Sequence, residues 1–187
     1  MQPWLDAFRA AAQDITRVLD DRPTRSEREP VVAAGQGGDD TTAIDDAAER
    51  AVVAQLEDLH RNGQEFTLVS EELGERVFGS GELLVVVDPI DGSVNAKRGL
   101  RNFCLSIAVA EGATMGDVVF GYVHDFGTGE EWTATRGSGA FLDGEPLGGV
   151  SPKEHVEILA MEGTLAASVA DHAVALVGYA QRFRIMG

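Results

Sequence analysis

The fold is decided by residues 83–93, which read LLVVVDPIDGS. A continuous apolar run that contains three valines is typical of a strand buried on both faces. Two carboxylates, Asp88 and Asp91, follow at the carboxyl end of this strand, where open α/β sheets commonly bind their ligands. Pro89 fixes its own φ and favours an extended Asp88, so we expect a stiff turn.

The residues after this strand suit a cation that bridges the protein to a phosphate. Gly92 lets the backbone approach a ligand closely, and the N–H groups of Gly92 and Ser93 can point at an anion if a helix begins here. Two carboxylates and the carbonyl of Ile90 are oxygen donors, which hard divalent cations prefer. The same residue types also form ordinary turns, so a solvated turn is the alternative interpretation.

A second short strand is predicted at Phe66–Ser70, and it runs into Glu71 and Glu72. If this strand neighbours the one that ends at Val87, the two carboxyl ends bring Glu71 beside Asp88. The alternative is that the glutamate pair only begins a solvated loop, which would continue over residues 74–81.

Apolar residues at helical spacing predict an amphipathic helix from about Thr42 to His60. Thr41 or Thr42 is a suitable N-cap, and Asp45 falls in the first turns, where a negative charge interacts favourably with the helix dipole. This structural role is sufficient by itself to explain Asp45.

The remaining pattern predicts one more helix before these elements and a series of strands after them. The first helix is expected at about Pro3–Asp20 and is followed by a charged loop over residues 21–29. After the aspartate motif we expect an antiparallel meander, then a strand, a helix and a last strand, at residues 103–110, 118–123, 131–135, 140–142, 156–161, 165–177 and 183–186. Two helices followed by antiparallel strands indicate an α/β or α+β fold with layered architecture.

The ordered set of motifs resembles the inositol monophosphatase family. The matching segments are residues 42–49, Glu71-Glu72, residues 88–95, residues 99–108 and residues 134–144. The form of the first and third segments is more similar to the archaeal branch, whose members often act on both inositol 1-phosphate and fructose 1,6-bisphosphate. The resemblance covers about residues 30 to 187.

The resemblance implies an enzyme, a Mg²⁺-dependent phosphomonoesterase that hydrolyses inositol 1-phosphate or fructose 1,6-bisphosphate, or both, through a metal-activated water. It implies a layered α-β sandwich in which a helix pair packs on a large, mostly antiparallel sheet. One alternative within the enzyme class is a 3′-phosphoadenosine nucleotide phosphatase. Another alternative is a truncated chain that binds metal without turnover.

The resemblance also assigns roles to residues of this chain. Glu71, Asp88 and the carbonyl of Ile90 would hold a first metal ion, and Asp88 with Asp91 would hold a second. The family site contains two or three Mg²⁺ ions when it is intact.

The resemblance assigns substrate binding and catalysis to a partly different set of residues. The backbone amides of Gly92 and Ser93 would bind the phosphate. Ser93, which stands where the family has threonine, would activate the attacking water together with Asp45, and Glu71 would join them in catalysis.

The family also carries a later Trp-Asp motif, whose aspartate completes the second metal site. The tryptophans here are Trp4 and Trp132, and neither precedes an aspartate. We therefore expect residues 1–187 to form one sugar-phosphatase domain that lacks its carboxyl-terminal part. The second metal site and the second layer of the fold would be incomplete.

Composition narrows the partners and the compartment. The formal net charge of −16 argues against nucleic acid or an anionic membrane as a partner, and favours a small phosphorylated substrate that follows cations into the site. Lys97 and Lys153 are the lysines among 15 basic residues, and such an acidic, lysine-poor composition is expected in a salt-loaded, halophilic cytoplasm.

The single cysteine, Cys104, is predicted to be an inert core residue. We find no signal peptide or membrane span and expect a cytoplasmic protein, for which a homodimer is one option.

Overall fold

The computed structural model describes residues 1–34, 40–149, 154–161 and 166–185. The chain separates into two compact units, residues 1–147 and residues 148–187, and each is described by itself. The expectation of a single domain over residues 1–187 stays a prediction. The glycine-rich stretch at residues 35–38 lies outside the described residues.

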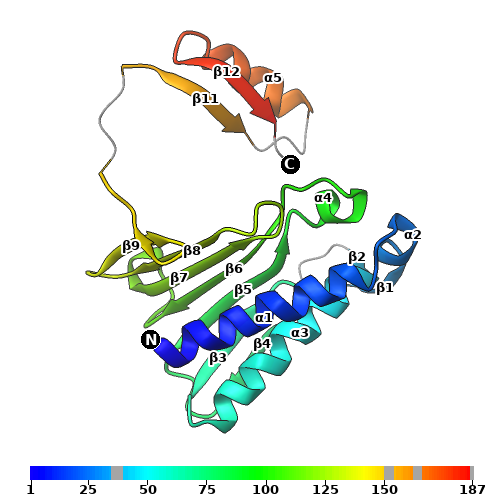
Figure 1. Ribbon diagram of the computed structural model, residues 1–187, viewed down its shortest axis with the longest axis vertical. Helices are drawn as coiled ribbons and strands as arrows, with labels where there is room; N and C mark the ends of the chain where they lie inside the picture. Colours follow the sequence, from blue (N-terminus) through cyan, green and yellow to red (C-terminus); the bar gives the residue numbers. More distant parts are fainter. Residues whose placement is uncertain (35–39, 150–153, 162–165, 186–187) are drawn as a thin grey trace. The chain divides into compact units, whose positions relative to one another are not determined.

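The first unit is built on an eight-stranded sheet with the order β10-β9-β8-β7-β6-β5-β3-β4 (Figure 1). Six of its seven neighbouring strand pairs are antiparallel, and the pair β3 and β5 is parallel, so the sheet is mostly antiparallel. Its strands are β3 (Phe66–Ser70), β4 (Gly74–Phe78), β5 (Leu84–Asp91), β6 (Cys104–Ala110), β7 (Val118–Asp125), β8 (Glu131–Thr135), β9 (Gly139–Leu142) and β10 (Glu145–Pro146).

Two long helices, α1 (Gln2–Asp20) and α3 (Ala43–Arg61), lie side by side along one face of this sheet (Figure 1). Both helices were expected from their apolar spacing, within a residue or two at each end. Their buried side chains, among them Phe8, Ile15 and Leu56, form one core cluster with apolar side chains of the sheet. The predicted fold class, a helix pair on a large mostly antiparallel sheet, is confirmed.

The pairing of the central strands fixes the position of the acidic motifs. β3 pairs with β5 in parallel, while β5, β6, β7, β8 and β9 pair antiparallel in sequence order. This confirms both the neighbouring strands and the meander that the sequence predicts. β5 continues through the proline motif to Asp91. Within the motif, a bulge interrupts its pairing with β6 between Asp88 and Asp91.

Three details of the sequence reading were wrong. The alternative interpretation of the glutamate pair placed residues 74–81 in a loop, but residues 74–78 form β4, which pairs antiparallel with β3. The charged loop at residues 21–29 contains a short helix, α2 (Arg25–Arg28). Val86 is 44% exposed, whereas Val85 and Val87 are buried, so β5 is not buried on both faces. Successive side chains of a strand alternate in direction, and α1 and α3 cover the face that carries Val85 and Val87.

Four short elements complete the first unit. β1 pairs antiparallel with β2, and α4 follows β5 directly. Their bounds are β1 (Val31–Ala34), β2 (Asp40–Thr42), α4 (Ser93–Arg98) and a 3₁₀ turn at Met115–Asp117.

The second unit contains two parallel strands and a helix. β11 (Val156–Met161) pairs in parallel with β12 (Ala180–Ile185), and α5 (Ala166–Ala175) lies between them in sequence. All three elements were expected, although β12 begins three residues earlier than predicted. None of the helices in the described parts of the chain is both long enough and apolar enough to cross a membrane.

Candidate active site

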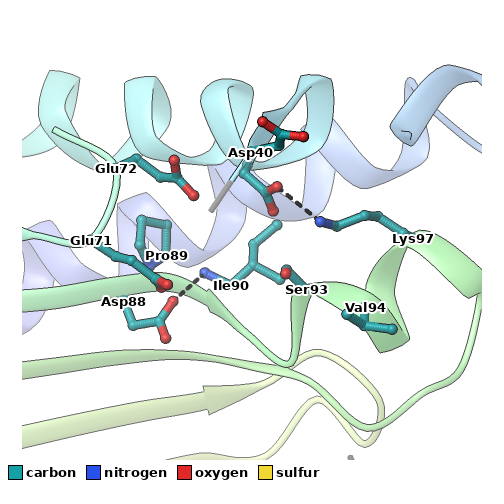
Figure 2. Close-up of a pocket in the computed structure, with 10 residues that line it drawn as sticks. Asp40, Glu71, Glu72, Asp88, Pro89, Ile90, Ser93, Val94 and Lys97 are labelled. Carbon is teal, nitrogen blue, oxygen red and sulfur yellow. Dashed lines mark hydrogen bonds and ion pairs between the residues drawn. The ribbon is translucent and has the colours of Figure 1, made fainter. Parts of the chain in front are cut away.

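The parallel pairing of β3 and β5 brings two of the predicted acidic residues to one edge of the sheet. Ser70 is in register with Val87, so the next residues along the two strands are Glu71 and Asp88. Figure 2 shows the side chains of Glu71 and Asp88 pointing toward one another, with Pro89 beside them. The sequence predicted that these two carboxylates lie close together, because it predicted that their strands are neighbours, and β3 and β5 do pair.

Both carboxylates line a cavity of about 320 Å³ (Figure 2). The side chains and backbone that line it come from β2, the start of α3, the residues after β3, the end of β5 and α4. They are Asp40, Asp45, Glu71, Glu72, Asp88, Pro89, Ile90, Ser93, Val94 and Lys97. Most of the predicted site residues therefore share one pocket, but Asp91 and Gly92 are not among the residues that line it.

Asp45 is held in the pocket wall by the start of α3. Its Oδ2 accepts a hydrogen bond from the backbone N–H of Thr42 at 3.1 Å, which is one half of a capping box, and another from the Thr42 hydroxyl at 2.5 Å. Its Oδ1 is buried and accepts no hydrogen bond from any residue that the structure describes. The capping role expected from sequence is confirmed, and it leaves one oxygen of Asp45 without a partner of its own.

A second buried carboxylate, Glu49, lies one helical turn further along α3. The Ser70 hydroxyl donates to its Oε2 at 2.5 Å, and its Oε1 has no hydrogen-bond partner in the described structure. Burial raises the pKa of Glu49, against the opposing effect of the Ser70 hydrogen bond. Glu49 was part of the resemblance, but sequence gave no reason to expect its hydrogen bond with Ser70.

The electrostatics of the pocket centre on Asp88. Burial is the largest cause that raises the pKa of Asp88 to about 7, and the negative charges of Glu71 and Asp91 raise it further. The backbone N–H of Ile90 donates to Asp88 Oδ1 at 3.1 Å and acts in the opposite direction. Ionised carboxylates held this close repel one another, and a bound cation removes that cost.

Asp91 is exposed at the end of β5, near the thiol of Cys104. The Cys104 Sγ lies 3.9 Å from Asp91 Oδ2. Cys104 is only partly buried, so its predicted place in the core was wrong; it is the first residue of β6 and lies at the end of the strand. Burial and the charge of Asp91 raise the pKa of Cys104 to about 12, which keeps the thiol protonated and unreactive, as expected.

The turn from β5 into α4 depends on a glycine. Gly92 has φ of 91°, a conformation that side chains other than glycine rarely adopt, and α4 begins at the next residue, Ser93. A Cβ at this position would lie 2.9 Å from the carbonyl oxygen of Asn102. The Asn95 side chain also donates to that carbonyl oxygen, at 2.8 Å. Close packing of this turn holds Ser93 at the pocket.

The donor set of the pocket fits a hard divalent cation, since carboxylate and carbonyl oxygens are the ligands that Mg²⁺ takes. No group of three or more His, Cys, Asp and Glu side chains converges to coordination distance within the described residues. Glu71 is exposed, and the charges of Glu71 and Asp91 act on Asp88 in the absence of a cation. The unpartnered Oδ1 of Asp45 is a further buried acceptor in the same wall.

Three charged residues that line the pocket were not predicted as site residues: Asp40, Glu72 and Lys97. Glu72 accepts a hydrogen bond from the hydroxyl of Thr41. The Nζ of Lys97 lies 3.2 Å from Asp45 Oδ2. A signal for Lys97 existed in the sequence, because a lysine in a lysine-poor chain lies four residues after Ser93 of the aspartate motif.

Comparison with known proteins gives a consistent assignment. The sequence model of the inositol monophosphatase family matches residues 1–179. The chain is 36% identical over 139 residues to the fructose-1,6-bisphosphatase/inositol-1-monophosphatase of Archaeoglobus fulgidus, covering 74% of this chain and 52% of that protein. It is 32% identical over 170 residues to the Nus factor SuhB of Salmonella typhimurium, covering 90% of this chain and 58% of that protein.

Solved structures agree with these sequence matches. The crystal structure of an inositol monophosphatase-fructose 1,6-bisphosphatase superposes with a TM-score of 0.78 at 25% identity, covering 98% of this chain and 68% of that one. A Thermotoga maritima IMPase superposes with a TM-score of 0.72 at 27% identity, covering all of this chain and 69% of that one. The chain spans about half the length of the curated relatives it matches. It belongs to the inositol monophosphatase family.

Proposed function

We propose that this chain carries the cation-binding half of a Mg²⁺-dependent phosphomonoesterase that acts on inositol 1-phosphate or fructose 1,6-bisphosphate. The observation that carries the proposal is the pocket in which Glu71 and Asp88 meet at the carboxyl ends of parallel strands. Curated relatives that match most of this chain are named as enzymes for both substrates.

The residues proposed to hold Mg²⁺ are Glu71, Asp88 and the carbonyl of Ile90, with Asp88 and Asp91 as ligands of a second ion. In support, Glu71, Asp88 and Ile90 line one pocket, and the charge of Asp91 acts on Asp88. Mg²⁺ in such a site supplies an activated water at neutral pH and stabilises negative charge on phosphoryl oxygens.

The chain's own residues would orient the substrate and move a proton. We assign proton acceptance to Asp45, whose Oδ1 has no hydrogen-bond partner among the described residues. The hydroxyl of Ser93, which lines the same pocket, would orient the attacking water toward Asp45, and Glu71, which also lines it, would assist. The amides of Gly92 and Ser93 would donate to the phosphate at the start of α4.

The order of binding follows from charge. The chain carries a formal net charge of −16, and acidic side chains dominate the pocket wall. An anionic phosphate is therefore repelled until a cation is bound. We expect Mg²⁺ to enter first and the phosphorylated sugar second. A nucleic-acid partner is not expected on the same grounds, although one relative is named a Nus factor and not a phosphatase.

A phosphate-release assay tests the proposal. The wild-type chain is incubated with Mg²⁺ and each of three substrates: inositol 1-phosphate, fructose 1,6-bisphosphate and 3′-phosphoadenosine 5′-phosphate. We expect Mg²⁺-dependent release from one of the first two, and a loss of about 100-fold or more in Asp45→Asn, which removes the proton acceptor. Preferential release from the nucleotide would instead support the nucleotide phosphatase. Binding of Mg²⁺ without release from any substrate would support a metal-binding chain without turnover.

A further inference from the structure

The acidic pocket contains one basic side chain among the described residues that line it. Five of the lining residues are acidic, and the basic one is Lys97 in the last turn of α4. The roles proposed above for the pocket make no use of this lysine. A cationic side chain inside a site built for cations needs a separate explanation.

Lys97 is held in the pocket by its geometry. Its side chain is 16% exposed, and its Nζ lies 3.2 Å from Oδ2 of Asp45, whose side chain is 7% exposed. The next residue, Arg98, is more exposed and lies outside the pocket: its side chain is 49% exposed and pairs with Glu29, which does not line the pocket. The positive charge of Lys97 is thus held beside Asp45 and largely buried, whereas the charge of Arg98 is solvated.

A fixed ammonium group has two electrostatic consequences in this pocket. An exposed ion pair is screened by solvent and has little effect, whereas a largely buried charge acts on its neighbours through a lower effective dielectric constant. The ammonium of lysine is a compact point charge that resembles a bound monovalent cation. It therefore repels a divalent cation at the neighbouring carboxylates, and it attracts a phosphate anion.

We propose that Lys97 is a built-in cation of this pocket, which takes the place of a metal ion beside Asp45, weakens Mg²⁺ binding at Glu71 and Asp88, and binds a phosphoryl oxygen of the substrate. This inference rests on the proposed function for its two ligands, Mg²⁺ and phosphate. Lys97 is thereby a positioning and specificity residue for phosphorylated substrates.

A purely structural role makes different predictions. If the ion pair only pins α4 to α3, removal of the charge lowers thermal stability and leaves ion binding unchanged. The two roles are separated by ion affinities measured on folded variants.

The experiment is titration calorimetry with Mg²⁺ at constant ionic strength. We expect Lys97→Met to bind Mg²⁺ about tenfold more tightly than wild type, because one positive charge near the ion is removed. The same charge is removed from the same helix in Arg98→Met, which is the matched control, and its affinity stays within about twofold of wild type because exposed charges are screened. Lys97→Arg, which retains the charge, also stays near the wild-type affinity.

Inorganic phosphate is the second probe, titrated at saturating Mg²⁺. Here Lys97→Met binds about tenfold more weakly than wild type, and Lys97→Arg restores most of the affinity. Circular dichroism melts establish that each variant is folded, and Lys97→Gln replaces Lys97→Met if the methionine variant is not. Mg²⁺ affinity that is unchanged or weaker in the neutral variants overturns the proposal.

The result is also separable from the proposed function. If wild type binds Mg²⁺ and Asp88→Asn does not, while Lys97→Met equals wild type, only the inference about Lys97 fails. Binding of Mg²⁺ by Lys97→Met but not by wild type supports the inference, since it shows the lysine blocking the site. If neither chain binds Mg²⁺, both ideas fail.

Discussion

Asp88 is the residue on which the chemistry of the pocket depends most. It lies in β5 directly before the proline of the turn motif, and burial together with the charges of Glu71 and Asp91 raises its pKa to about 7. An ordinary aspartate has a pKa near 3.9. The folded chain therefore holds a proton on Asp88 over a pH range in which the unfolded chain has lost it.

This difference predicts how stability depends on pH. Between about pH 4 and pH 7 the folded state binds more protons at Asp88 than the unfolded state, so this residue's contribution to the free energy of unfolding falls as pH rises. Below about pH 4 both states are protonated, and above about pH 7 both are ionised. Urea unfolding in the presence of EDTA, compared between wild type and Asp88→Asn, measures this contribution. A difference between the two proteins that stays constant from pH 4.5 to pH 7.5 would contradict the raised pKa.

At the same scale, sequence could predict some contacts of the site and not others. Glu71 and Asp88 were placed together because each follows a strand, and neighbouring strands bring their ends together. The ion pair of Lys97 with Asp45 joins residues 52 positions apart and depends on the direction of α4, which no local pattern determines. The hydrogen bond from Ser70 to Glu49 likewise depends on how α3 packs against β3.

Among the elements, the turn between β5 and α4 decides where the pocket residues point. Gly92 has φ of 91° and packs against the carbonyl of Asn102. Gly129 has a similar φ of 81°, but a Cβ there would meet no atom within 4 Å. A comparison of substitutions at Gly92 and Gly129 therefore separates the cost of backbone strain from the cost of close packing.

We expect Gly92→Ala to lower the free energy of unfolding by about 2 kcal/mol more than Gly129→Ala, because only the first also forces a side chain against neighbouring atoms. Each substitution alone carries a strain of about 1 kcal/mol or more from the positive φ. Urea unfolding of both variants checks the difference. Equal losses in the two variants would show that the turn tolerates a side chain at Gly92.

Secondary structure was predicted well where apolar residues recur at a regular spacing over many residues. It was predicted poorly where a segment becomes a strand only by pairing with a neighbouring strand. α1 and α3 have clear helical spacing, and the strands after the aspartate motif alternate with turns. β4 has no such pattern and is a strand only because β3 offers it an edge. The exposure of Val86 was missed because an apolar run does not reveal which face of a sheet the helices cover.

For the whole molecule, charge is the dominant property. The formal net charge is −16, and several of the ion pairs are exposed pairs within one helix, which contribute little to stability. Self-repulsion of the folded chain is therefore substantial and is reduced when salt screens it.

We expect the urea midpoint of the chain to rise as KCl increases from 0.1 M toward 2 M, and we propose that the protein is adapted to a salt-rich cytoplasm. Equilibrium unfolding over a series of KCl concentrations measures this. A midpoint that stays flat or falls over the series would rule out that adaptation.

The central claim is that carboxylates from separate elements form one cation site, and Mg²⁺ titration calorimetry of wild type beside Asp88→Asn tests it most directly. Glu145→Gln removes an exposed acid far along the chain and serves as the control. We predict saturable Mg²⁺ binding by wild type and Glu145→Gln, and binding at least about tenfold weaker by Asp88→Asn, since a formal charge next to the ion is lost. Equal Mg²⁺ affinity in all three proteins would contradict the account.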